Sequence, residues 1–327
     1  MNSAKVDLHL HLDGSLYMPW AYKKALERKV ISEDCTFEEY YWSYFSTEYK
    51  TREEGFKRFE IPISILQHYE DLSDATYTLI ELLAKQGLIY AEIRFAPSQH
   101  CKAGLTQKEA VEAVMDGVKR AKKVFNIEIG IINCLMHKGE NALFNMDDNM
   151  ETVMVTKELL GDIVVGLDLA GYENNGEFTL YEPLFKKAHE LNIPYTIHAG
   201  EMGEGKHVHD AIMMKASRIG HGVNCVQDEK WLKEVVDTQI PLEVCLSSNV
   251  KKDHNYAAHP IRQLLAANAK VTINTDNLIF AQTNLQNEHN QLMALGVSEE
   301  QLLQCTKNAI DAAFCSQEVK EKLYKKL

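Results

Sequence analysis

Short apolar segments that could form strands recur along the chain, and segments with helical periodicity separate them. Several strand candidates are almost continuously apolar, such as EIGIINCLM (128–136) and DIVVGLDL (162–169). This pattern is typical of parallel strands that are covered on both faces. Eight strands are predicted in all: Val6–His11, Leu88–Phe95, Glu128–Met136, Ile163–Asp168, Tyr195–Ala199, Arg218–Gly220, Leu242–Cys245 and Val271–Asn274.

The segments between these strand candidates carry the apolar spacing of amphipathic helices. One of them, residues 105–125, begins with Thr106 and Glu109 at the spacing of a capping box. Regular alternation of strand and helix with right-handed crossovers gives a parallel sheet, and eight units can close it into a TIM-type (β/α)8 barrel. An open doubly wound sheet is the alternative, but no G-x-G-x-x-G motif follows the first strand to support it.

The first connection is much longer than one helix requires. We interpret residues 17–86 as an insertion of extra helices that forms a lid over one mouth of the barrel. No internal repeat, low-complexity tract or interdomain linker is visible. Since α/β barrels of this length commonly form one domain, residues 1–327 are predicted to be a single domain.

The balance of charge narrows the choice of partners. The chain has 47 Asp and Glu against 35 Lys and Arg, which gives a formal net charge of −12. This excess of negative charge would repel a phosphate backbone, so we expect a small-molecule substrate and no nucleic-acid partner.

The sequence also indicates a cellular location. No apolar run of about 18 residues or more is present, so no membrane helix is expected. The start, MNSAKVDLHLHLDGSL, lacks the charged start, apolar block and cleavage site of a signal peptide. The seven cysteines are scattered and form no C-x-x-C pair, which favours neither a disulfide framework nor a thiolate zinc site. We therefore predict a cytoplasmic protein; its oligomeric state is not predicted.

The first strand contains the strongest local chemical signal. His9 and His11 are two residues apart, so on a strand both imidazoles point to the same face. Neutral imidazole is a common zinc ligand, although an H-x-H pair alone is a weak signal. All strands of a barrel end in one ring, and the active site of such folds lies there. Polar side chains at the ends of three other strand candidates would join this ring: His198, Glu201, His221, Asp276 and Asn277.

A metal centre at this ring explains the pattern better than packing does. His9, His11, His198 and Asp276 form a shell of nitrogen and oxygen donors that suits zinc, with iron, cobalt and manganese as alternatives. A hydrolytic reaction also needs one group that handles the attacking water and another that protonates the substrate. Two titratable side chains of the ring remain for these tasks, Glu201 and His221. Taken singly, Glu201 is also compatible with a carboxylate at a helix start and His221 with a buried structural histidine, but the ensemble of polar residues at one ring favours the catalytic interpretation.

Seven motifs in chain order resemble the adenosine deaminase family, and the similarity extends from the first strand to the last helices (NAIDAAF, 308–314). Each motif alone is unremarkable, but their order at barrel-strand spacing is highly specific. The motifs are HLHLDGSL (9–16), YAEIRFAP (90–97), GLDLAGYE (166–173), TIHAGE (196–201), IGHG (219–222), LEVC-x-SSN (242–249) and NTDN (274–277).

The resemblance implies a TIM-type barrel with one zinc ion per chain and a defined set of roles. The ligands would be His9, His11, His198 and Asp276. It implies that Glu201 donates a proton to purine N1. It also implies that His221 and Asp276 position and deprotonate the water that attacks C6, so that ammonia leaves and inosine remains.

The resemblance further implies how the substrate is held. Gly171 would offer its backbone N–H to purine N3, at a point where a side chain would obstruct the base. Asp13 would accept a hydrogen bond from the ribose 5′-hydroxyl, and the ligand His11 would also belong to the substrate site. Asn277 stands where animal-type members of the family have aspartate, and its amide can still donate to purine N7. We assign supporting or structural roles to two further residues, Arg94 and Asp168.

The substrate that this resemblance favours is adenosine, together with 2′-deoxyadenosine. Asp13 argues against a nucleotide, because a 5′-phosphate would lie against a carboxylate in a poorly screened pocket. Related deaminases that act on adenine, on a nucleoside with a modified 5′ position such as aminodeoxyfutalosine, or on an N6-methylated purine nucleoside or nucleotide share the same chemistry and remain alternatives.

Other classes fit the sequence less well. Two-metal hydrolases that open with H-x-H use a carboxylated lysine at the end of the fourth strand. Here that strand ends in Asp168-Leu169-Ala170-Gly171, which contains no lysine. No H-x-E is followed by a P-C-x-x-C, the combination that marks cytidine-deaminase zinc sites. A barrel that only binds nucleosides would be expected to have lost Glu201, His221 or a ligand, and none is lost.

Overall fold

The structure is a computed structural model that describes residues 4–45, 55–137, 145–173, 178–250 and 255–327. All eight predicted strands are present, each ending within three residues of its predicted bounds. The strands are β1 (Lys5–His11), β2 (Leu88–Phe95), β3 (Glu128–His137), β4 (Val164–Gly171), β5 (Thr196–Ala199), β6 (Arg218–His221), β7 (Leu242–Val244) and β8 (Val271–Ile273).

The strands pair in parallel and in chain order, as a (β/α)8 fold requires. They form two four-stranded sheets, β1-β2-β3-β4 and β5-β6-β7-β8. Isolated parallel bridges join these halves on both sides, Leu167 to Tyr195 on one and Leu10 to Asp276 on the other. At the second junction the N–H of Asp276 donates to the carbonyl of His9 at 2.8 Å. The predicted barrel architecture is therefore confirmed, with its halves joined by single bridges in place of continuous ladders.

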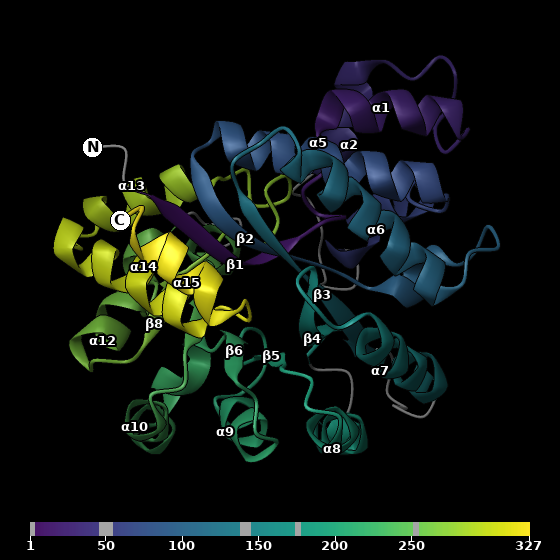
Figure 1. Cartoon of the computed structure of the whole chain (residues 1–327). Coiled ribbons are helices and arrows are strands. Elements are labelled where there is room, and N and C mark those ends of the chain that lie inside the picture. Colours follow the sequence, from purple (N-terminus) through teal and green to yellow (C-terminus); the bar gives the residue numbers. More distant parts are fainter. Residues whose placement is uncertain (1–3, 46–54, 138–144, 174–177, 251–254) are drawn as a thin grey trace.

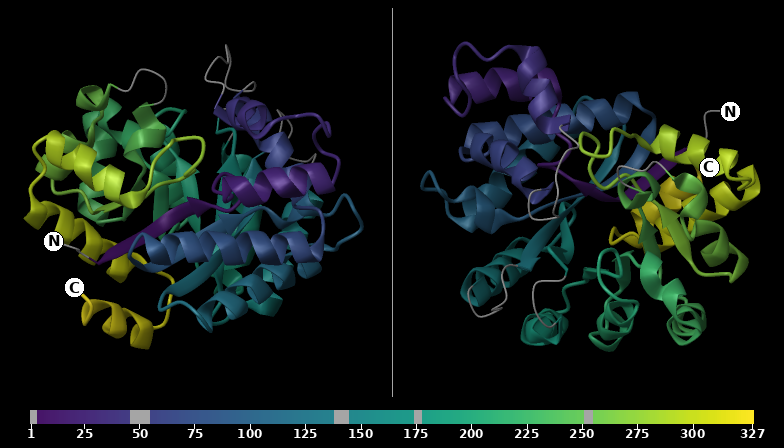
Figure 2. Two further views of the ribbon diagram at one scale, coloured as in Figure 1. Left: turned by 90° about the horizontal axis from the view of Figure 1, so that it is seen from above. Right: turned by 180° about the vertical axis from the view of Figure 1, so that it is seen from behind.

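Helices surround this ring of strands (Figures 1 and 2). Thr106 and Glu109 form the predicted capping box at the start of α6, with both reciprocal hydrogen bonds present. The helices that follow β2 to β8 are α6 (Gln107–Lys122), α7 (Met146–Leu159), α8 (Glu182–Glu190), α9 (Lys206–Met213), α10 (Glu229–Thr238), α11 (Leu246–Val250), α12 (Ile261–Ala266), α13 (Leu285–Ala294), α14 (Glu299–Ala312) and α15 (Gln317–Tyr324).

The connection after β1 contains extra helices, as the sequence predicted. They are α1 (Met18–Glu27), α2 (Phe37–Phe45), α4 (Glu60–Ile65) and α5 (Tyr69–Lys85), and α1 packs against the other three. Residues 46–54 of this insertion lie outside the described part of the chain. In Figure 1 the insertion lies to one side of the ring, next to α6. No helix among the described residues is long and apolar enough to cross a membrane.

The interior of the ring holds a network of buried charges as well as apolar side chains. Arg218 donates from Nε to Glu243 Oε1 at 2.6 Å and from Nη2 to Glu92 Oε2 at 2.5 Å. Arg94 Nη2 reaches the other oxygen of Glu243 at 2.9 Å. All four side chains are fully buried. Buried charges are costly unless each is paired and hydrogen-bonded, and here each one is.

Candidate metal and catalytic site

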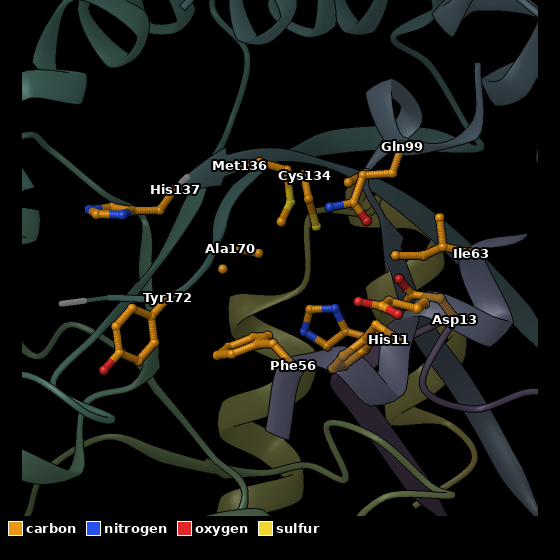
Figure 3. Close-up of a pocket in the computed structure, with 14 residues that line it drawn as sticks. His11, Asp13, Phe56, Ile63, Gln99, Cys134, Met136, His137, Ala170 and Tyr172 are labelled. Carbon is orange, nitrogen blue, oxygen red and sulfur yellow. The ribbon is translucent and has the colours of Figure 1, made fainter. Parts of the chain in front are cut away.

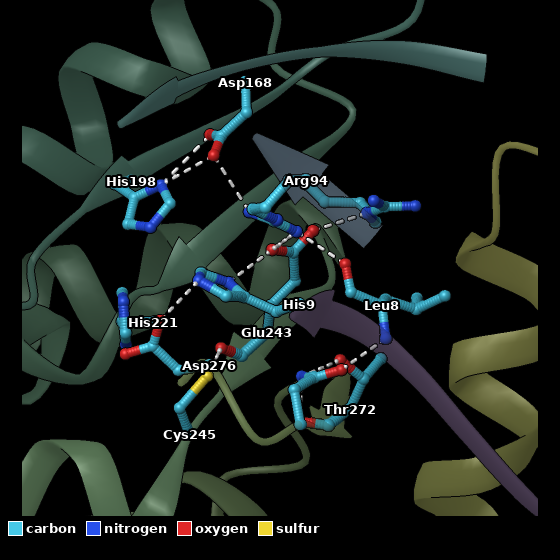
Figure 4. Close-up of polar contacts among 12 residues, drawn as sticks. Leu8, His9, Arg94, Asp168, His198, His221, Glu243, Cys245, Thr272 and Asp276 are labelled. Atoms are coloured by element: carbon cyan, nitrogen blue, oxygen red, sulfur yellow. Dashed lines mark hydrogen bonds and ion pairs between the residues drawn. The ribbon is translucent and has the colours of Figure 1, made fainter. Parts of the chain in front are cut away.

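The strand ends bring the predicted ligands together, and Figure 4 shows His9, His198 and Asp276 among them. The ring of His9 lies 4.5 Å from that of His198, 4.7 Å from that of His221 and 5.4 Å from that of His11, measured between centroids. The carboxylate of Asp276 lies beside them, with Oδ1 3.6 Å from His9 Nε2 and 3.4 Å from His11 Nε2. Residues from the first, fifth, sixth and last strands thus meet at one point.

The donor set fits a transition-metal ion. Among the described residues two triads have donor atoms within 4.8 Å of one another, His9 with His198 and His221, and His9 with His11 and Asp276. His9, which both triads share, has a fully buried Nε2 without a hydrogen-bond partner. Such a nitrogen among other lone-pair donors is costly unless it binds a cation. His221, for which the sequence suggested a catalytic role, is close enough to be a ligand as well.

The imidazoles are oriented from behind by buried carboxylates. His9 Nδ1 donates to Glu243 at 2.8 Å and His198 Nδ1 donates to Asp168 at 2.9 Å, which directs Nε2 of both rings into the site. Arg94 joins the two carboxylates, at 2.9 Å from Glu243 and 3.0 Å from Asp168. Burial alone would raise the pKa of Glu243, but Arg94 and Arg218 hold it well below its ordinary range. Carboxylate–histidine pairs of this kind fix ligand geometry in metal sites.

Two residues of the site have unusual backbone conformations. His221 has φ of 63° and Asp276 has φ of 61°, both in the left-handed region that non-glycine residues rarely adopt. Neighbours in α11 hold their side chains: His221 Nδ1 lies 3.1 Å from Asn249 Nδ2, and Ser248 Oγ donates to Asp276 Oδ2 at 2.5 Å. Strained residues that are held in this way cluster at active sites.

Glu201 lies in the loop after β5 and reaches the same site. Its Oε2 is 3.9 Å from His221 Nε2, and its side chain is 10% exposed. The two groups to which the sequence assigned proton transfer are therefore adjacent, at the edge of the metal cluster.

A cavity of about 330 Å³ opens beside the cluster. His11, Asp13 and Gly171 line it, whereas Asn277 is not among its lining residues; its amide donates to Asp276 Oδ1 at 2.6 Å. His11 and Asp13 lie on one side of the cavity in Figure 3, opposite the side chains of β3. Most of the remaining lining is apolar, and part of it comes from the insertion. The other lining residues are Phe56, Phe59, Glu60, Ile63, Ala96, Gln99, Cys134, Met136, His137, Ala170 and Tyr172.

Gly171 and Asp13 each meet a specific constraint in this cavity. Gly171 has φ of 112°, and a Cβ there would lie 2.7 Å from the carbonyl oxygen of His137. Glycine is therefore required by the neighbouring strand, a different reason from the contact with a base that the resemblance implied. Burial, with a smaller effect of Asp276, raises the pKa of Asp13 to about 6. A buried carboxylate that can accept hydrogen bonds thus faces the cavity.

Some residues of the site were not found from the sequence. The sequence marks Glu243 only as part of a strand and a motif, although an acidic residue inside the apolar run LEVC is a signal of a buried polar role. The aromatic residues Phe56 and Phe59 of the insertion line the cavity. No sequence rule placed them there, because the path of a long connection is not a local property.

Comparisons with known proteins agree with this geometry. Residues 4–327 match the family model described as adenosine deaminase. The chain is 35% identical over 343 residues to an adenosine deaminase of Clostridium perfringens (99% of this chain, 97% of the relative), and 35% identical over 329 residues to one of Haemophilus ducreyi (97% and 94%).

Solved structures with the same fold include three deaminase or amidohydrolase chains. An adenine deaminase from Arthrobacter aurescens has a TM-score of 0.88 at 24% identity, covering 98% of this chain and 97% of its own. An Arabidopsis N6-mAMP deaminase has a TM-score of 0.85 at 25% identity (99% and 97%). An amidohydrolase from Burkholderia ambifaria with bound zinc has a TM-score of 0.86 at 19% identity (99% and 89%).

Proposed function

Because this chain belongs to the adenosine deaminase family, we propose that it is a zinc-dependent hydrolase that converts adenosine, and 2′-deoxyadenosine, to inosine or deoxyinosine and ammonia. The observation that carries this proposal is the meeting of His9, His11, His198 and Asp276 beside a cavity of about 330 Å³, the size range of a small-molecule site. The zinc bound in the Burkholderia neighbour supports this choice of metal. Seven free cysteines support a cytoplasmic location.

The proposed reaction replaces the amino group on purine C6 by an oxygen from water. The metal, when held by His9, His11, His198 and Asp276, supplies the Lewis acidity that makes water nucleophilic at neutral pH. The carboxyl of Glu201 gives its proton to N1, which makes C6 electrophilic. His221 and Asp276 accept a proton from the water as its oxygen bonds to C6. His221 and Asp276 then pass this proton to the amino nitrogen as its bond to C6 breaks, so that it leaves as ammonia, and the proton that remains on the new oxygen returns to Glu201 as the C6=O bond forms.

The substrate would be held by groups that surround the cavity. Gly171 would donate its backbone N–H to purine N3, and Asn277 its amide to N7 if the side chain turns from Asp276. Asp13 and His11, which line the cavity together, would bind the ribose end. The carboxylate of Asp13 accepts from the N–H of Gly14 at 3.1 Å, and its two oxygens have further acceptor capacity for a sugar hydroxyl. The insertion would act as a lid through its aromatic residues.

Loss of ultraviolet absorbance at the adenosine band tests this function. Purified protein is assayed in parallel with adenosine, 2′-deoxyadenosine, adenine and AMP, with and without a metal chelator. We expect chelator-sensitive conversion of the two nucleosides and no conversion of AMP. Conversion of adenine or AMP in preference to adenosine would assign the chain to one of the related deaminase activities instead.

A further inference from the structure

The loop between β5 and α9, which carries Glu201, is held by one side chain from another strand end. Four consecutive backbone N–H groups point to the carboxylate of Glu173, which follows β4. The distances to its oxygens are 2.5 Å from Gly200, 3.0 Å from Glu201, 2.7 Å from Met202 and 2.9 Å from Gly203. Convergent N–H groups of this kind form an anion-binding nest, and here the anion is part of the protein.

The residues around Glu173 stabilise its carboxylate and leave space for it to approach the loop. Its side chain is almost fully buried, and His207 at the start of α9 donates from Nδ1 to it at 2.8 Å. Burial raises the pKa of Glu173, but His207 and the loop N–H groups lower it below its ordinary value. A Cβ at Gly203 would lie 2.8 Å from Glu173 Oε1 and 2.2 Å from His207 Nδ1. Only glycine at this position allows the carboxylate to approach.

The opposite side of the same loop is held by Asn224. This residue lies in η5 (Val223–Gln227), three positions after His221. Its backbone N–H donates to the carbonyl of Gly200 at 2.8 Å. Its side-chain Nδ2 donates to the carbonyls of Glu201 at 3.2 Å and Gly203 at 2.8 Å. The peptide groups on both sides of Glu201 are therefore fixed, and the fixing residue belongs to the turn that follows His221.

We propose that Glu173 and Asn224 are positioning residues of the deamination reaction, which hold Glu201 at the site and in register with His221. The proposal rests on the proposed function of Glu201. Residues 201–203 are partly exposed, so water could satisfy their N–H groups without a buried carboxylate. What the carboxylate adds is a fixed orientation, and a displacement of about 1 Å at a reacting group can cost about 100-fold in rate.

The primary test is Glu173→Gln, which keeps the shape of the side chain but replaces one acceptor oxygen by a donor. Asn224→Ala is the second variant, because it removes the opposite contact and leaves Glu173 intact. Zinc content, thermal unfolding, kcat and KM for adenosine are measured for each. We expect kcat to fall by about 10- to 100-fold, with zinc retained and KM changed by less than about threefold.

A matched control is Asp71→Asn. Asp71 is also a fully buried carboxylate, but it binds Arg28 at 2.6 Å and Lys24 at 3.3 Å, on the side of α5 that faces α1. The Asp71→Asn substitution should lower the unfolding temperature and leave kcat unchanged. Loss of kcat in Asp71→Asn equal to that in Glu173→Gln would show a general effect of stability and overturn the proposal.

A double-mutant cycle separates positioning from structure. If Glu173 acts through Glu201, adding Glu173→Gln to Glu201→Gln should reduce the residual kcat by less than about threefold, because the group to be positioned is already lost. Two outcomes would overturn the proposal and leave the proposed function standing. One is a double variant whose loss of kcat equals the product of the two single losses; the other is a normal kcat in both Glu173→Gln and Asn224→Ala. Near-normal activity of Glu201→Gln alone would instead refute the role of Glu201 on which both rest.

Discussion

The buried charges inside the ring should support both the fold and the metal site, and Glu243→Gln tests this directly. Glu243 accepts hydrogen bonds from His9 at 2.8 Å, Arg94 at 2.9 Å and Arg218 at 2.6 Å, with no exposure to solvent. Glutamine has the same shape but only one acceptor oxygen. Whichever way its amide lies, its NH2 group faces at least one of these N–H donors.

The expected magnitude follows from these contacts. Removing one partner of a buried ion pair costs about 3–5 kcal/mol, since the other charge stays buried without compensation. A looser His9 should in addition lower metal affinity by about 10- to 100-fold, as the loss of residues that orient metal ligands typically does. The free energy of unfolding of a domain is about 5–15 kcal/mol in total. The variant should therefore still fold, but with much of its unfolding free energy lost.

Urea unfolding of the metal-free protein measures the first effect, and zinc titration against a competing chelator measures the second. Glu288→Gln is the control for stability. Glu288 is also buried, but it accepts from the neutral groups Ser247 N at 3.1 Å and Thr283 Oγ1 at 2.5 Å, and burial raises its pKa. A neutral amide should therefore cost less there. Unchanged unfolding and unchanged zinc affinity in Glu243→Gln would refute the reasoning.

Three further predictions follow from single residues. His198→Ala should lose zinc and activity together, and a fully metallated, active variant would contradict its assignment as a ligand. Asp13→Ala should raise KM for adenosine by about 10-fold but leave 5′-deoxyadenosine unaffected, because only adenosine has the hydroxyl that Asp13 would bind; equal effects on both would remove this role. Burial lowers the pKa of His100 to about 4, against about 6.5 in an unfolded chain, so its stabilising contribution is complete above pH 6.5 and is lost as the pH falls toward 4. The free energy of unfolding, measured with urea across this pH range, should fall by about 3 kcal/mol less in His100→Gln than in the wild type. Parallel plots of unfolding free energy against pH for the two proteins would contradict this.

The sequence could predict the ring of strands because that information is local. Near-continuous apolar runs identify buried strands, and the two-residue spacing of His9 and His11 places both side chains on one face. The end of one strand could not be predicted in this way. The prediction ended β4 at Asp168, whereas the strand continues to Gly171, because β3 continues to His137 and pairs with it there. A strand's length depends on its partner, which the apolar pattern of one segment does not contain.

The residues that orient the site could not be predicted, because their roles depend on contacts between distant segments. Glu173 was recognised only as the last letter of a motif, and its four N–H donors come from a loop about 30 positions later. Asn224 carried no signal beyond its place after a strand. Histidine and aspartate adopt the left-handed region more often than most residues, but this preference does not indicate which of them do so, and at His221 and Asp276 the turn after each strand sets the conformation.

The bridge from Leu10 to Asp276 has a consequence for how the protein is made. Leu8 and Asn274, hydrogen-bonded just below this bridge, are 266 positions apart in the chain. His9 and His11 leave the ribosome more than 260 residues before Asp276, whose carboxylate completes their triad. A growing chain therefore cannot assemble this triad until its final strand docks on its first, a contact of very high sequence separation that folds slowly. Metal capture should then coincide with closure of the whole molecule, so retention of zinc would report complete folding of a nascent or truncated chain.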